Sequence, residues 1–93
     1  MTDKRFFITT SIPYVNGEPH IGFALEAIQC DVLARWHRQN GYDTRYLSGT
    51  DENALTNVQA AEREGISIRE LVDRNAPRFE ALRGPLHLTT DDF

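Results

Sequence analysis

The sequence predicts an α/β fold, namely the first half of a parallel, nucleotide-binding sheet that is incomplete on its own. A strand-like run, a helical pattern of about twenty residues and a second short strand follow one another from the N-terminus. Two strands joined through such a helix form a right-handed parallel crossover. Two strands are too few for a doubly wound sheet, which has more strands and covered faces. We therefore expect residues 1–93 to be the N-terminal half of one domain.

The first strand is predicted over Arg5–Ile12, because the run RFFITTSI is rich in aromatic and β-branched residues. We expect this strand to be buried and to end before Pro13. A loop containing Asn16, Gly17 and a second proline follows it.

A long helix is predicted from His20 to Gln39. Apolar residues recur there at spacings of four, three, four and four, and form one stripe: Ile21, Leu25, Ile28, Val32 and Trp36. Gly41 follows the pattern, as a glycine commonly does at a helix C-terminus.

The second half of the chain is predicted to be mainly helical. A short strand over Thr44–Ser48 and a Gly-Thr-Asp turn lead into a helix from about Glu52 to Glu64. Ser67 and Glu70 have capping-box spacing and start a third helix. We expect Pro77 to kink or divide that helix. The last residues, RGPLHLTTDDF, predict a turn leading towards another strand.

Composition and motifs exclude several function classes. Fourteen acidic against ten basic residues give a net charge of -4, which argues against a free-standing nucleic-acid module. The lone Cys30 cannot form an internal disulfide or a zinc knuckle. With no membrane-spanning run and no secretory signal in MTDKRFF, we expect a cytoplasmic protein that does not enter a membrane. Dinucleotide and P-loop glycine motifs are absent from the sequence.

The most informative residues lie where the two strands end. Ligands of open parallel sheets bind at the carboxyl ends of the strands, and a helix N-terminus there attracts phosphate. His20 adds a side-chain donor, and Gly22 allows a base or ribose to approach the helix backbone. Asp51 follows the second strand and should face the same crevice, suiting an ammonium group. The alternatives are that His20 and Asp51 merely cap the helices that follow them.

The stretch IPYVNGEPHIGF resembles the HIGH signature region of class I aminoacyl-tRNA synthetases. Its flanks are similar to the methionine-specific members, and the match extends through DVLARWHRQNGYD, YLSGTDEN, AAEREGIS and DDF. The resemblance implies a Rossmann-like (HUP-type) catalytic domain, of which residues 1–93 would be the N-terminal half. It implies methionine–tRNA ligase activity, in which methionine and ATP, supplied as its Mg²⁺ complex, form methionyl-adenylate before transfer to tRNA.

The resemblance also assigns site residues. His20, the catalytic candidate, and Gly22 match the first histidine and the glycine of the signature, and Phe23 stands where its last histidine belongs. These three residues would bind ATP. Ile12 and Tyr14 match the wall of the methionine side-chain pocket, and Asp51 matches the carboxylate that holds the amino group.

The sequence departs from the family pattern beyond Phe23. NALTN follows GTDE where HGQKI is common, and the 93 residues contain no KMSKS loop, zinc-bearing insertion or anticodon-binding helices. We therefore expect no zinc site in this segment, contact with tRNA only through other regions, and a truncated synthetase that is inactive alone. The alternatives are a non-catalytic nucleotide- or methionine-binding module, and a degenerate paralog that serves in an assembly. An open strand edge and uncovered helix faces predict self-association or a larger partner.

Overall fold

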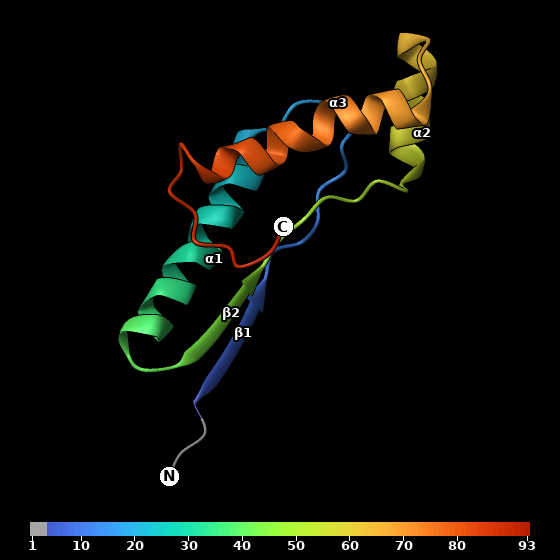
Figure 1. The fold of residues 1–93 in the computed structure, drawn as a ribbon. Coiled ribbons are helices and arrows are strands. Elements are labelled where there is room, and N and C mark those ends of the chain that lie inside the picture. Colours follow the sequence, from blue (N-terminus) through green and yellow to red (C-terminus); the bar gives the residue numbers. More distant parts are fainter. Residues whose placement is uncertain (1–3) are drawn as a thin grey trace.

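The computed structural model describes residues 4–93, which form an elongated body of 57 × 24 × 17 Å. In chain order the elements are β1 (Arg5–Thr9), α1 (Ile21–Gln39), β2 (Asp43–Leu47), α2 (Leu55–Glu64), α3 (Ile68–Glu80) and a 3-10 turn, η1 (Ala81–Arg83). Figure 1 shows β1, α1 and β2 gathered at one end, α2 at the other, and α3 running back between them. The described part of the chain contains no helix that is both long and apolar enough to span a membrane.

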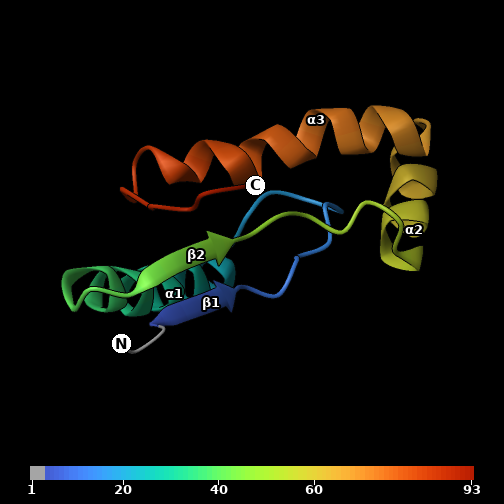
Figure 2. The same cartoon turned by 60° about the horizontal axis from the view of Figure 1, so that its bottom comes forward.

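The β1–α1–β2 unit is the predicted parallel crossover. The two strands pair in parallel from Arg5 opposite Asp43 to Thr9 opposite Leu47. Helix α1 packs against both strands (Figure 2), while α2 lies beyond their carboxyl ends. This arrangement confirms the predicted α/β class.

β1 is shorter and less buried than predicted. The last sheet bond runs from the Thr10 N–H to the Leu47 carbonyl, and the next N–H, that of Ser11, donates to Glu26 instead. The strand therefore ends at Thr9 rather than at Ile12. Because helix α1 covers only one face of the pair, the side chain of Phe7 is 62% exposed on the other face.

Helix α1 has the predicted extent, with His20 as its N-cap and Gly41 in the left-handed region (φ +82°) just after its end. The residues that it buries are Phe23, Ala27, Asp31 and Ala34. The five residues of the apolar stripe are 41–86% exposed, and so this helix face is uncovered.

Helices α2 and α3 pack on one another, and α3 also packs on the loop after β1. α3 begins with the predicted capping box of Ser67 and Glu70, and runs through Pro77 to Glu80 without being divided. The expected division is absent, since packing on both sides of the proline holds the helix: Val72 and Phe79 are buried with Val15 and Phe23. A second cluster, of Ala60, Ala61 and Leu71, joins α2 to α3.

The C-terminal segment, which the sequence predicts to turn towards another strand, returns to the sheet but forms only an isolated bridge. The Asp91 N–H donates to the Tyr46 carbonyl and the Ser48 N–H donates to the Asp92 carbonyl, forming a parallel bridge beside β2. The buried carboxylate of Asp31 on α1 accepts from the N–H and hydroxyl of Thr89 at 2.7 and 2.6 Å. Burial opposes ionisation of Asp31, but these bonds and Arg35 hold its pKa below the ordinary value.

Candidate functional site

Two loops meet at the carboxyl ends of the strands. Tyr14, in the loop after β1, forms an isolated parallel bridge with Asp51, in the loop after β2. The Asp51 N–H donates to the carbonyl of Pro13 at 2.8 Å. The structure thus places Tyr14, predicted to line the methionine pocket, beside Asp51, predicted to bind the ammonium group. Their two backbone segments are joined by a hydrogen bond.

Ile12 lies at the same junction. Its Cγ2 atom would be 3.6 Å from a Cβ on Gly49, and its side chain is 51% exposed. Ile12, Tyr14 and Asp51 therefore sit on two contacting loops, with apolar side chains beside a carboxylate. Such a junction suits an amino acid with an apolar side chain.

Asp51 does not cap α2, contrary to the alternative based on sequence. Helix α2 begins at Leu55 with Ala54 as its N-cap, because the bond between Asp51 and Pro13 holds the preceding residues in the loop. The Oδ1 atom of Asp51 instead accepts from the Asn53 N–H at 3.1 Å. One carboxylate oxygen therefore shapes the loop, and within residues 4–93 Oδ2 accepts no hydrogen bond and is available to a ligand.

His20 caps α1 through its side chain. Its Nδ1 atom accepts from the N–H of Gly22 at 2.9 Å, and its backbone is extended. In a neutral imidazole whose Nδ1 accepts, the proton is on Nε2, which is then a donor. The capping role and the donor role proposed from sequence are compatible, because they use different ring nitrogens.

Gly22 is required by His20 itself. A Cβ at this position would lie 2.6 Å from Cε1 and 2.9 Å from Nδ1 of the His20 ring. The sequence argument gave only ligand access as the reason for this glycine. The structure adds that the imidazole occupies the space a side chain would take.

Phe23 is a core residue of the first helical turn. It is 6% exposed, and its ring packs edge-on against Phe79 of α3 with centroids 5.4 Å apart. It also lines an open cavity of about 420 Å³ with Pro13, Tyr14, Asn16, Glu18, His20 and Phe79. Phe23 therefore anchors the helix tip to α3 and offers an apolar wall, where a histidine would offer a donor.

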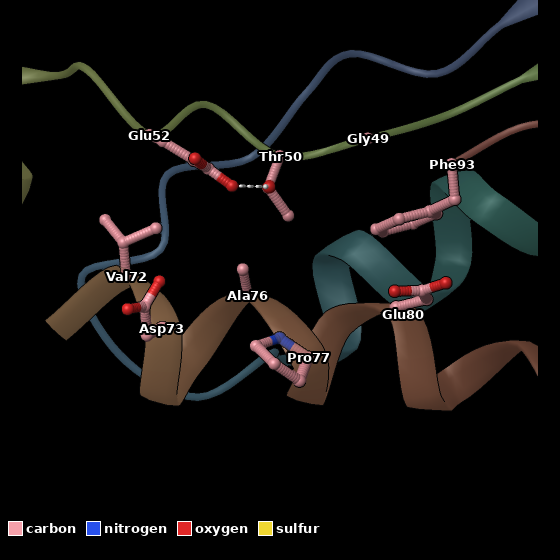
Figure 3. Close-up of a pocket in the computed structure, with 9 residues that line it drawn as sticks. All are labelled: Gly49, Thr50, Glu52, Val72, Asp73, Ala76, Pro77, Glu80 and Phe93. Atoms are coloured by element: carbon pink, nitrogen blue, oxygen red, sulfur yellow. Dashed lines mark hydrogen bonds between the residues drawn. The ribbon is translucent and has the colours of Figure 1, made fainter. Parts of the chain in front are cut away.

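A second cavity, of about 540 Å³, lies between the loop after β2 and α3. Figure 3 shows Gly49, Thr50 and Glu52 facing Val72, Asp73, Ala76, Pro77 and Glu80, with Phe93 at one end. The sequence did not predict it, because its walls come together only through packing. Within residues 4–93, no group of three His, Cys, Asp or Glu side chains is placed to hold a metal ion.

Three residues that sequence reasoning missed shape the two loops. Asn57 and Asn75 are fully buried, and their amides donate to the carbonyls of Asp51 and Val15 at 2.9 and 2.7 Å. Glu26, on α1, accepts from the Ser11 N–H. Only one feature of the sequence indicates that the two asparagines are buried: each is a polar residue among the apolar positions of a predicted helix.

Comparison with known proteins agrees with this geometry. A family model described as tRNA synthetases class I (M) matches residues 6–93. The chain belongs to this family. In sequence it is 45% identical over 93 residues to a methionine–tRNA ligase of Brucella suis, covering 100% of this chain and 18% of the relative. It is also 45% identical over 89 residues to that of Thermotoga maritima, covering 96% of this chain and 14% of the relative.

The structural comparison places the chain within the same synthetase family. A structure of Mycobacterium tuberculosis methionyl-tRNA synthetase in complex with methionyl-adenylate superposes with a TM-score of 0.93 at 40% identity. The match covers 97% of this chain and 18% of that one. The chain therefore corresponds to less than a fifth of these relatives.

Proposed function

We propose that residues 1–93 supply the methionine- and ATP-binding loops of a cytoplasmic methionine–tRNA ligase. The observation that carries the proposal is the Tyr14–Asp51 bridge, which joins the two loops beside the N-terminus of α1, where His20 lies. The structural relative from Mycobacterium tuberculosis holds methionyl-adenylate, a ligand with an amino-acid part and a phosphate part. The two loops offer chemistry for both parts.

The amino-acid part is held by the loop junction. The carboxylate of Asp51 pairs with the ammonium group of methionine, a strong charge-assisted interaction. Ile12 and Tyr14 line the apolar side chain. These contacts leave the methionine carboxylate free to react with ATP.

The phosphate part is held by the N-terminus of α1. The helix dipole favours anions there, and the Nε2–H of His20 adds a donor. One oxygen of the methionine carboxylate attacks the α-phosphorus of ATP, the bond to the β-phosphate bridging oxygen breaks, and pyrophosphate leaves. His20 acts by stabilising the charge on the phosphate oxygens. Mg²⁺ enters with ATP as part of the substrate.

Transfer of the methionyl group to tRNA requires contacts outside these residues. A second role, in assembly, is favoured by one observation: the uncovered stripe on α1. Exposed apolar patches of this kind mark interaction surfaces. We propose that the stripe packs against a second copy of the chain or a larger partner.

Calorimetric binding of ATP and of methionine tests the proposed function. We expect the chain to bind both, and we expect His20→Ala to weaken ATP binding at least tenfold without changing methionine binding. Gln29→Ala, an exposed change on the same helix, is the control. Failure of the wild-type chain to bind either ligand, or equal ATP affinity in the His20 and Gln29 variants, would contradict the proposal.

A further inference from the structure

The carboxylate of Glu26 ties the start of the first loop to helix α1. Its Oε1 atom accepts from the Ser11 N–H at 2.6 Å, and the Ser11 hydroxyl lies 2.9 Å from both carboxylate oxygens. Ser11 is the residue that leaves the sheet after Thr10 and directly precedes Ile12. Glu26 lies on α1, about one and two-thirds turns beyond His20.

We propose that Glu26 is a positioning residue that sets the placement of the methionine subsite relative to the phosphate subsite. This inference rests on the proposed function. An ionised carboxylate is an acceptor only, which matches the two donors that Ser11 presents. Bonds to a charged acceptor are shorter and stronger than neutral ones, so the link is stiff.

The other hydrogen bonds that anchor this loop lead to other elements, although Val15 also packs with Phe23 at the start of α1. Pro13 is bonded to the loop after β2 through the Asp51 N–H, and Val15 is bonded to α3 through Asn75. Ser11 is thus the point where a side chain of α1 holds the start of the loop. Without Glu26 the loop keeps its anchors at Pro13 and Val15, but Ser11 and the adjoining Ile12 lose their fixed distance from α1.

Such a loss affects ligands selectively. Methionine alone contacts one subsite and ATP alone mainly the other, so each can bind when the subsites shift relative to one another. Methionyl-adenylate spans both, and reacting groups displaced by about 1 Å can cost about a hundredfold in rate. A residue that only stabilised the fold would weaken all three ligands alike.

Calorimetry with three ligands tests this. The probes are methionine, ATP and a methionyl-adenylate analogue with a sulfamoyl linkage in place of the phosphate. For Glu26→Ala we expect at least a tenfold loss of affinity for the analogue and less than a threefold loss for each separate ligand. Glu26→Gln, which keeps one acceptor oxygen, restores most of the affinity. Glu62→Ala, an exposed change on α2, leaves all three affinities unchanged.

Ser11→Ala makes the test independent of how the Glu26 variants fold. It removes the hydroxyl and leaves Glu26 in place, and should give the same selective loss at smaller size. Hydrogen exchange of the Ser11 amide should speed up in Glu26→Ala, because its acceptor is gone. If the wild-type chain binds no ligand, the proposed function and this inference both fail. If it binds all three and Glu26→Ala binds the analogue normally, or loses all three equally, the positioning role alone is wrong.

Discussion

The His20 ring occupies the space that a side chain on Gly22 would fill, with Nδ1 2.9 Å from the Gly22 N–H. One contact therefore caps α1, sets which ring nitrogen carries the proton, and explains the glycine. The histidine and glycine of the signature are parts of one local arrangement. Their substitutions should accordingly have related effects.

Gly22→Ala should weaken ATP binding while changing stability little. The new Cβ forces the imidazole out of its place, which costs a side-chain cap of about 1 kcal/mol. Alanine offsets up to about 1 kcal/mol through its better helix propensity. The measurements are thermal unfolding and calorimetric ATP affinity. Gly17→Ala is the matched control, since a Cβ there meets nothing within 4 Å. Equal ATP affinity in the two variants would show that the ring position is unimportant.

Asp51→Asn should leave stability nearly unchanged and abolish methionine recognition. Asparagine keeps an oxygen that can accept from the Asn53 N–H, so the loop keeps its shape. It loses the charge that pairs with the ammonium group. Thermal unfolding and methionine affinity are measured together. A variant that melts several degrees lower and binds methionine normally would make Asp51 a structural residue only.

Stability should fall in acid through Asp31. Folding lowers the pKa of this carboxyl below its ordinary 3.8. The carboxyl therefore contributes fully to the free energy of unfolding above that pH. The contribution is lost as the pH drops through the lower folded-state value. Urea unfolding at pH 7 and pH 3 should show a smaller drop for Asp31→Asn than for the wild type. Asp73→Asn, which removes an exposed ion pair with Arg69, is the control and should behave as the wild type.

The 93-residue chain should catalyse no methionine-dependent exchange between ATP and pyrophosphate. The sequence contains no KMSKS motif, and the fourth signature position offers the apolar ring of Phe23 in place of a second imidazole. Binding of the substrates without turnover is the expected result. Exchange clearly above that of a His20→Ala variant would overturn this expectation.

The α1 stripe should drive association of the chain. Val32 is 59% exposed in the middle of the stripe, so Val32→Glu should shift sedimentation towards the monomer. Leu55→Glu places the same change at an exposed leucine on α2 and should have no such effect. A wild-type chain that is monomeric at micromolar concentration would argue against association with a second copy.

The parts of the fold that depend on nearby residues were predictable. The apolar spacing of α1, the glycine after it and the Ser67–Glu70 capping box are all local signals, and each matches the structure. The start of α2 was misplaced because the Asp51–Pro13 bond, which joins two loops, delays the helix. The strand β1 was overextended because Ser11 finds its acceptor on α1.

The candidate site likewise contains residues with local sequence signals and residues whose partners are distant in the sequence. His20, Gly22 and Asp51 could be proposed as site residues from their places after the ends of the strands. Glu26 could not be assigned a role, because its partner lies fifteen residues away. Asn75 and its partner Val15 are sixty residues apart, so only the folded chain reveals their bond.

That sixty-residue separation also sets an order of assembly. Closing a chain segment costs entropy that grows with its length, so the α1 cap and the shorter β1–α1–β2 crossover can form first. During synthesis from the N-terminus, the carbonyl of Val15 emerges long before the amide that binds it. The loop that carries Tyr14 thus acquires its final anchor only when α3 has been made and has docked.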